Sequence, residues 1–167
     1  MRVFHGSYME IESPETCKGR DKVDFGRGFY LTGIQLQAEK WARVVSIRKG
    51  PEFQPSVSIF DLNGDVFHDA TYCIKSFSEY DMEWLEYVID CRRGGEMQRK
   101  YDLVEGGVAN DNVIDTVEDY ENGRLTAEQA LGQLVYKKVN HQICIRNQRI
   151  IDQYLSFVSS YKISEKQ

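Results

Sequence analysis

Two glycines separated by one residue, Gly26 and Gly28, stand directly before a short run of aromatic and aliphatic residues at 29–32. Glycine adopts left-handed backbone angles at little energetic cost, so this spacing predicts a tight turn. Aromatic and β-branched residues favour the pleated geometry of a strand. The segment therefore predicts a fold in which a sharp turn leads straight into a strand of a sheet.

Short strand-like segments and longer helix-like segments are irregularly interleaved along the rest of the chain. Strands are predicted at 2–5, 28–32, 56–62, 101–109 and 141–145. Helices are predicted at 34–50, 78–95, 112–123, 126–136 and 149–161. Because no regular succession of strand, helix and strand occurs, the pattern predicts an α+β fold with a mixed or antiparallel sheet.

Several of the predicted helices carry signals for their start or for their buried face. Ser78 and Asp81 form a candidate capping box, and Thr126, with Gln129 three residues on, marks another helix start. Trp41 lies at helical spacing with its apolar neighbours and is expected in the core. The last helix carries an amphipathic pattern, with an apolar stripe made of Ile150, Ile151, Tyr154, Leu155 and Val158.

The overall composition is that of a globular protein. A chain of 167 residues with 41% hydrophobic residues can bury a core, and we expect one domain over 1–167, with the last few residues disordered. The net charge of −5 argues against a protein that coats nucleic acid by electrostatics alone. Charge is unevenly distributed, because 105–128 is acidic whereas Lys137, Lys138, Arg146 and Arg149 form a basic end.

The four cysteines, Cys17, Cys73, Cys91 and Cys144, stand far apart without a C-x-x-C pair. This spacing predicts neither a zinc site nor a disulfide framework, and no metal site is expected. The first ten residues lack an apolar signal-peptide core, and no run of 18 apolar residues occurs. We therefore expect a cytoplasmic protein without membrane association.

The best candidates for ligand contacts stand at the end of the first predicted strand. His5 is followed by Gly6 and Ser7, and a glycine there would let a ligand approach the backbone N–H and C=O groups. A histidine at a strand end is, however, more often structural than ligand-binding. Tyr30, in the second predicted strand, is likewise more often part of the core. Each of these residues alone is a weak indicator of a functional site.

In combination, these segments resemble a known superfamily of enzymes. "FHGS" at 4–7, "GRGFYLT" at 26–32 and "QAEKWA" at 37–42 resemble the ADP-ribosyltransferase superfamily, in the diphtheria-toxin and poly(ADP-ribose) polymerase branch with its His-Tyr-Glu pattern. Together with "DLVEGGVANDNV" and "YKKVNHQICI", they are similar to a bacterial family known as domain of unknown function 3990, which is allied to those enzymes. The resemblance runs from about Val3 to about Leu155.

The resemblance implies a split mixed or antiparallel sheet flanked by helices, with NAD bound in a bent conformation across a cleft. It implies that the backbone of Gly6 pairs with the nicotinamide carboxamide and that His5 holds the adenosine-side ribose, helped by Ser7. Tyr30 would stack on the nicotinamide ring, as aromatic rings favour flat, partly cationic partners. Gly28, with Gly26, would let the chain turn beside the ligand.

The same resemblance leaves the pyrophosphate to an arginine. Arg27, or Arg20 on the preceding segment, could neutralise it, because the planar guanidinium suits phosphate oxygens. An arginine on a loop is also often simply solvated.

The third position of the His-Tyr-Glu pattern departs from the superfamily, because "NHQICI" contains no carboxylate. Gln142 or His141 must occupy that position, and a one-residue slip of the strand exchanges which of them faces the cleft. We favour Gln142, whose amide can still bond a ribose hydroxyl. Asp111 is a candidate substitute carboxylate, although it or Asn110 could simply cap a helix. Asp24 is a third candidate, although an aspartate commonly begins a turn.

The expected function is an NAD-dependent mono-ADP-ribosyltransferase, which releases nicotinamide and transfers ADP-ribose to a protein or a nucleic acid. The resemblance also implies a toxin paired with an antitoxin protein that covers or occupies the cleft. Two alternatives keep the fold. The protein could be an NAD glycohydrolase, with water as the acceptor, or a non-catalytic module that binds NAD or ADP-ribose.

Overall fold

The structure is a computed structural model that describes residues 1–109, 111–134 and 140–164, and for Asp111 and Asn112 it describes the backbone alone. The last three residues, for which disorder is predicted, and Tyr136, the predicted end of a helix, lie outside the described residues. No helix in the described ranges is long and apolar enough to cross a membrane.

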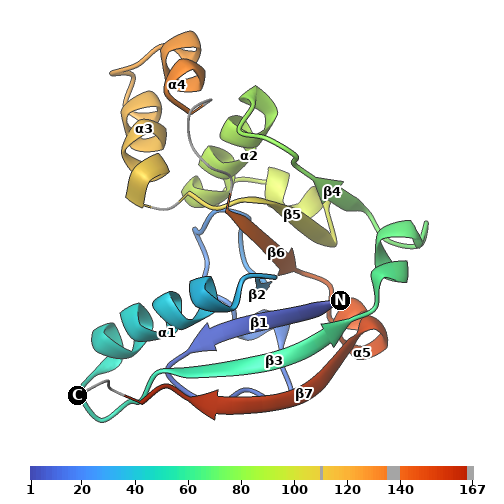
Figure 1. The fold of residues 1–167 in the computed structure, drawn as a ribbon. Helices are drawn as coiled ribbons and strands as arrows, with labels where there is room; N and C mark the ends of the chain where they lie inside the picture. Colours follow the sequence, from blue (N-terminus) through green and yellow to red (C-terminus); the bar gives the residue numbers. More distant parts are fainter. Residues whose placement is uncertain (110, 135–139, 165–167) are drawn as a thin grey trace.

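The described part of the chain contains seven strands and five α-helices in an α+β arrangement (Figure 1). The strands are β1 Arg2–Ser7, β2 Phe29–Leu31, β3 Ser56–Leu62, β4 Ile74–Ser76, β5 Leu103–Gly107, β6 His141–Ile145 and β7 Leu155–Lys162. The helices are α1 Gln35–Lys49, α2 Met82–Arg93, α3 Asp111–Glu121, α4 Ala127–Leu134 and α5 Gln148–Tyr154. The five predicted strands are confirmed, whereas β4 and β7 are additional.

The strands form two sheets. β1, β3 and β7 make an antiparallel sheet in the order β1-β3-β7. The second sheet has the order β2-β6-β5-β4 and is mixed, because β4 pairs parallel with β5 while the other pairs are antiparallel. One isolated bridge, between Phe4 and Thr32, links the edge strands β1 and β2 of the two sheets.

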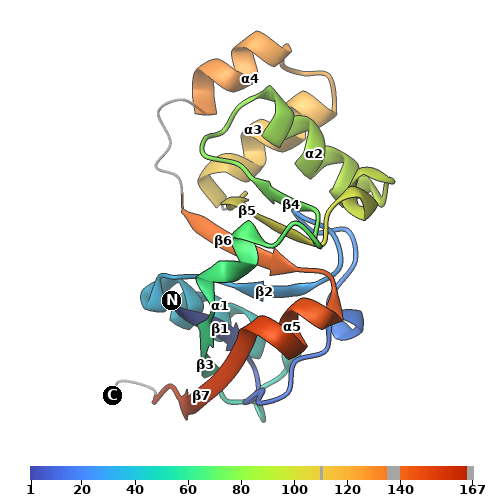
Figure 2. The same ribbon diagram turned by 90° about the vertical axis from the view of Figure 1, so that its right-hand side faces the viewer.

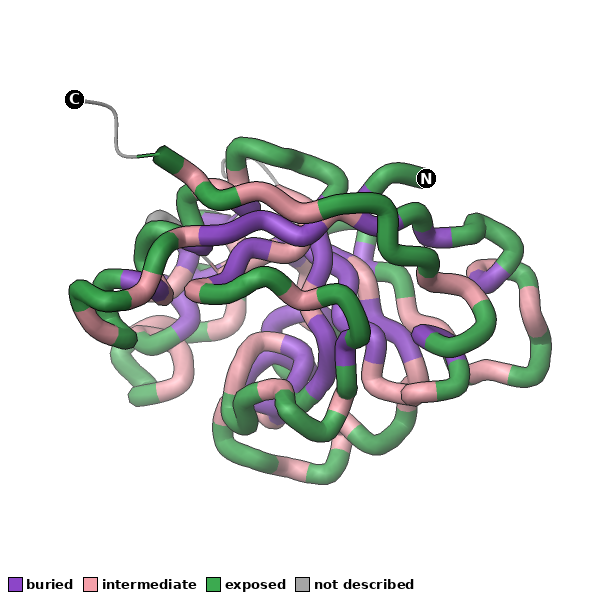
Figure 3. The backbone as a smooth tube through the Cα atoms, turned by 90° about the horizontal axis from the view of Figure 1, so that it is seen from below, coloured by how far each residue is buried: buried purple, intermediate pink, exposed green. Residues whose placement is uncertain are grey.

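Three groups of buried side chains hold these layers together. One group joins both sheets and α5, with Val3 of β1, Phe60 of β3 and Ile143 of β6 all essentially inaccessible to solvent. Buried residues are concentrated in β3, β5 and β6, and in Figure 3 the purple segments lie mostly inside the molecule with green, exposed segments around them. A second group lies under α2, α3 and α4, which gather at one end of the molecule in Figure 2. The third is the small contact of α1 with β1 and β3.

α1 packs on its sheet through small residues, contrary to the prediction for Trp41. Ala38, Ala42 and Ser46 are the buried residues of α1, whereas the Trp41 side chain is 41% exposed. The reason is the close approach of α1 to Gly6, since a Cβ at Gly6 would collide with the backbone of Ala38. Only small side chains fit such a contact, so the larger apolar residues of α1 turn outward.

The prediction of a helix at 149–161 is correct only up to Tyr154. α5 ends at Tyr154, and Leu155–Lys162 forms the edge strand β7, paired antiparallel with β3. The segment 155–162 contains Phe157, Val158 and Tyr161, whose aromatic and β-branched side chains favour strands, and three serines, which are poor helix formers. As a strand, 155–162 also gives hydrogen-bond partners to backbone N–H and C=O groups of β3. A helix would use its own backbone groups internally and would leave those of β3 without partners.

The predicted capping box of Ser78 and Asp81 is wrong. Asp81 is itself the N-cap of α2, because its carboxylate accepts a hydrogen bond from the Trp84 N–H at 2.7 Å, and the helix begins at Met82 rather than near Ser78. Thr126 and Gln129 form a reciprocal capping box before α4, with N···O distances of 2.8 and 3.2 Å.

We expect Gly6→Ala to destabilise the protein by about 1–3 kcal/mol, because the added methyl group forces α1 away from β1. Gly132→Ala is the matched control, since a Cβ there meets nothing within 4 Å and alanine is the better helix former. Urea unfolding of both variants measures the effect. Equal stability of Gly6→Ala and wild type would show that α1 does not pack this closely.

Candidate functional site

Three of the predicted site residues, His5, Gly6 and the backbone of Tyr30, lie where β1 and β2 diverge. At the bridge, the Phe4 N–H donates to the Thr32 carbonyl at 2.8 Å and the Thr32 N–H donates back at 3.0 Å. One residue further along β1, the His5 side chain forms the next link to β2, because its Nδ1 atom lies 2.7 Å from the Tyr30 carbonyl oxygen. The two strands are thus joined by one backbone bridge and one side chain.

The contact with Tyr30 shows which ring nitrogen of His5 carries a proton. A carbonyl oxygen can only accept, so Nδ1 carries the proton and Nε2 is the acceptor of the neutral ring. Burial lowers the pKa of His5 more than the hydrogen bond to Tyr30 raises it. The ring also stacks on Phe29, with centroids 4.4 Å apart. His5 is therefore an oriented, neutral imidazole that presents a lone pair at Nε2.

Gly6 presents backbone groups toward β2. Residues two apart in a strand point their N–H and C=O groups to the same side, so Gly6 faces β2 as Phe4 does. Among the described residues, however, no hydrogen bond joins Gly6 to β2. Gly6 is itself buried under α1. A ligand group that offers both a donor and an acceptor could pair with this backbone.

Tyr30 is held by the turn that precedes it. Its hydroxyl donates to the Gly26 carbonyl at 2.8 Å and accepts from the Phe25 N–H at 3.0 Å. Gly26 adopts a positive φ of 73°, and a Cβ at Gly28 would meet the Ile145 carbonyl at 2.7 Å. Gly26 therefore lets the turn fold back toward Tyr30, and Gly28 lets the chain lie close against β6. Burial raises the pKa of Tyr30 well above its ordinary value, which keeps the phenol neutral.

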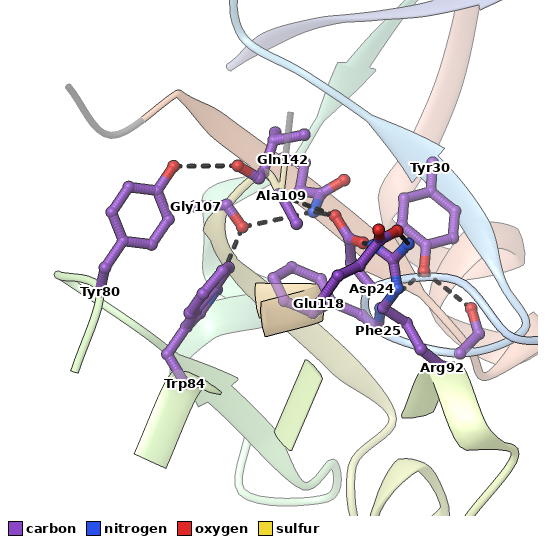
Figure 4. A network of polar contacts seen from close by, with 12 residues as sticks. Asp24, Phe25, Tyr30, Tyr80, Trp84, Arg92, Gly107, Ala109, Glu118 and Gln142 are labelled. Atoms are coloured by element: carbon purple, nitrogen blue, oxygen red, sulfur yellow. Dashed lines mark hydrogen bonds and ion pairs between the residues drawn. The ribbon is translucent and has the colours of Figure 1, made fainter. Parts of the chain in front are cut away.

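A buried carboxylate, Asp24, lies beside the third predicted position (Figure 4). Its Oδ2 accepts from the Ala109 N–H at 2.9 Å and from Nε2 of Gln142 at 3.1 Å. Its Oδ1 accepts from the Arg92 guanidinium at 3.2 Å, and the Asp24 side chain is only 13% exposed. Arg92 also lies 4.0 Å from the Glu118 carboxylate.

Burial is the dominant influence on the ionisation of Asp24. It raises the pKa of the carboxyl group, while the hydrogen bonds from Ala109 and Gln142 and the charge of Arg92 lower it. The net direction is upward, so Asp24 holds a proton more readily in the folded chain than in the unfolded one.

The strand register distinguishes Gln142 from His141. Tyr30 pairs with Cys144, so Gln142, two residues away, shares the face of Tyr30 and Asp24. The side chain of His141 points to the opposite face, where Nε2 lies 3.1 Å from the Glu105 carboxylate. Glu105 also accepts from the Ser76 hydroxyl at 2.6 Å. The structure therefore brings Gln142, not His141, to the side where Tyr30 and Asp24 meet.

The remaining predicted residues are spread over the molecule. Ser7 is 7% exposed, at the end of β1. Arg27 forms an exposed ion pair with Asp21, and the Arg20 guanidinium lies 5.3 Å from the Trp41 ring centroid, beside α1. The Asp111 side chain lies outside the described residues, as do Asn110, Lys137 and Lys138. In the described part of the chain, no cluster of three potential metal ligands occurs.

Sequence reasoning missed Arg92 and gave Asp24 only a minor place. Arg92 stands in an ordinary helix end, and no pattern in the sequence connects it to the turn at 24–28. An aspartate just before a glycine turn, such as Asp24, commonly serves the turn itself and does not by itself indicate a functional site. Only the packing of α2 against that turn shows that the two charges meet.

Two surface hollows, of about 440 and 370 Å³, lie away from these residues. The first is lined by Asp69, Thr71, Tyr72, Arg149, Asp152 and Gln153, and the second by Tyr8, Met9, Glu10, Glu52, Phe53, Gln54, Ser56 and Lys162. His5, Tyr30 and Gln142 line neither hollow. NAD binding at the divergence of β1 and β2 would therefore use a different part of the surface.

We expect the stability difference between wild type and Asp24→Asn to depend on pH. Because the folded pKa is raised above its ordinary value of 3.8, the stability that Asp24 contributes is fully present below the unfolded pKa. It is lost as the pH rises through the folded pKa. Urea unfolding of both proteins between about pH 3 and 7 should show wild type losing stability relative to the variant as pH increases. A constant difference would exclude a buried, titrating Asp24.

A family model described as "Protein of unknown function (DUF3990)" matches residues 1–157. No curated protein and no solved structure matches the chain significantly.

Proposed function

We propose that this chain, which belongs to the DUF3990 family, is an NAD-dependent mono-ADP-ribosyltransferase. It would break the bond between the nicotinamide nitrogen and the ribose carbon and transfer ADP-ribose to a protein or nucleic-acid acceptor. The observation that carries the proposal is the hydrogen bond from the His5 side chain to the Tyr30 backbone carbonyl, directly before Gly6 and where β1 and β2 diverge. These are the residues that the resemblance to the superfamily singles out.

The groups at this point suit the two ends of such a substrate. The backbone of Gly6 offers an N–H and a C=O toward β2, which complement the C=O and NH₂ of a carboxamide. The Nε2 atom of His5 is a lone-pair acceptor and suits a ribose hydroxyl. Both are fixed by the fold, so a substrate would bind to groups that need little rearrangement.

The Asp24–Gln142 pair would replace the glutamate of the superfamily pattern. As the glycosidic bond breaks, its electron pair leaves with nicotinamide and positive charge develops on the ribose. A carboxylate in a site of low dielectric stabilises such charge strongly. In the described part of the chain, Asp24 is the carboxylate that contacts Gln142, and it therefore supplies the charge that the Gln142 amide lacks. The acceptor nucleophile then bonds to the ribose carbon and loses its proton.

The first experiment measures nicotinamide release from NAD by the purified protein, with and without cell lysate as a source of acceptors. We expect His5→Gln to reduce release about 100-fold or more, because Nε2 no longer positions the ribose. His68→Gln is the matched control, since His68 is exposed on the 3-10 helix Gly64–His68.

The outcomes separate three activities. Release that requires lysate supports a transferase, whereas equal release without lysate indicates an NAD glycohydrolase. If folded wild type releases no nicotinamide although NAD raises its melting temperature, the protein is a binding module and the catalytic proposal is wrong.

The contact between Asp24 and Gln142 gives a second test. Gln142→Glu alone should lose about 3 kcal/mol of stability, because it places a second carboxylate about 3 Å from Asp24. Combining it with Asp24→Asn restores one carboxylate and one amide with exchanged positions, and should recover most of that loss. We expect the double variant to release nicotinamide at least as fast as wild type. A stable double variant with no release would place the reaction away from this pair.

A further inference from the structure

In α1 the small side chains face the sheet and the large apolar side chains face outward, which is the reverse of the usual arrangement. Its sheet-facing residues are small, whereas Leu36, Val44 and Ile47 on its outward face are 67%, 37% and 81% exposed. Lys40 and Arg43 lie between them on the same face by helical spacing, and both are exposed. Single exposed apolar residues are common on protein surfaces, but a row of them on one helix face indicates a binding surface.

This face also carries unpaired positive charge on an acidic protein. Among the described residues, Lys40 and Arg43 take part in no ion pair, and the same holds for Arg48 and Lys49 at the end of α1. Elsewhere on the surface, ion pairs are formed by Arg2, Lys18, Arg27, Lys75, Arg93, Arg99 and Arg124. Glu39, the acidic residue of α1, accepts hydrogen bonds from Tyr161 and Gln35, and the charge of Arg43 contributes less than these bonds to the lowered pKa of its carboxyl group.

We propose that the outward face of α1, made of Leu36, Lys40, Arg43, Val44 and Ile47, docks an acidic amphipathic helix of a partner protein. Charge complementarity supports this partner, because two unpaired cations lie within the apolar row. The length also fits. Leu36 and Ile47 are eleven residues apart, about 16 Å along a helix, which matches about three turns of a partner helix laid along it.

Two other occupants fit less well. A second copy that packed symmetrically through α1 would bring Lys40 and Arg43 of both chains together, and like charges at an interface are costly. A membrane-binding helix keeps its basic residues on a polar face opposite the embedded one. Here Lys40 and Arg43 lie among the apolar residues, so a bilayer would have to take up both charges.

The test uses the full chain and two synthetic helical peptides of the same length with the same leucine row. One peptide carries glutamate at its remaining positions and the other carries lysine. Fluorescence anisotropy should show at least about ten-fold tighter binding of the glutamate peptide, weakening as salt increases. The variant Lys40→Glu/Arg43→Glu should reverse the preference. Lys22→Glu/Lys100→Glu, which makes the same charge change at exposed residues elsewhere, should leave it unchanged.

Several results would overturn the proposal, and none of them depends on the enzymatic activity. Equal affinity for the two peptides, or a preference that survives Lys40→Glu/Arg43→Glu, would show that this face does not select an acidic helix. Binding to vesicles containing phosphatidylserine, or to a DNA duplex, that is lost in the same variant would identify a different class of partner. Dimerisation in sedimentation experiments that requires Ile47 would identify a second copy.

Discussion

The single bridge between Phe4 and Thr32 is the constraint on which the rest of the structure depends. It joins two sheets whose other strands pair only within their own sheet, and it lets both contribute to one buried core. Because the bridge is one residue pair long, β1 and β2 separate immediately after it. The imidazole of His5 and the backbone of Gly6 therefore lie at the opening between β1 and β2. In the described part of the chain, the backbone of Gly6 makes no hydrogen bond to β2.

Asp24 connects this opening to the helical end of the molecule. A buried carboxylate is costly to desolvate, and the cost is partly offset here by Arg92, the Ala109 N–H and the Gln142 amide. These partners come from α2, from the segment after β5 and from β6. One side chain thus links three elements that are distant in sequence, and its burial makes their relative placement specific rather than merely favourable.

The sequence predicted well what depends on neighbouring residues. The turn at Gly26 and Gly28 and the capping box of Thr126 and Gln129 both follow from local backbone chemistry, and both are present. The sequence placed the start of α2 one turn too early, at Ser78 instead of Asp81. It failed where tertiary contacts decide. The segment 155–162 became a strand because β3 offers it a partner, and the apolar residues of α1 face outward because Gly6 admits only small neighbours. The choice between Gln142 and His141 required the strand register.

α1 has two opposite surfaces, and the close fit of one has a consequence for the other. Ala38 and Ala42 pack so closely on Gly6 that α1 cannot shift toward β1 without a steric clash, and we therefore treat the helix and the strand as one unit. A molecule bound to the outside of α1 and a molecule bound to the backbone of Gly6 would share that unit. If binding at one surface shifts the helix, thermodynamic reciprocity requires that each molecule change the affinity of the other by the same factor. Because α1 packs so closely on Gly6, binding at the outward face of the helix could change the affinity for a molecule bound in the opening beside β2.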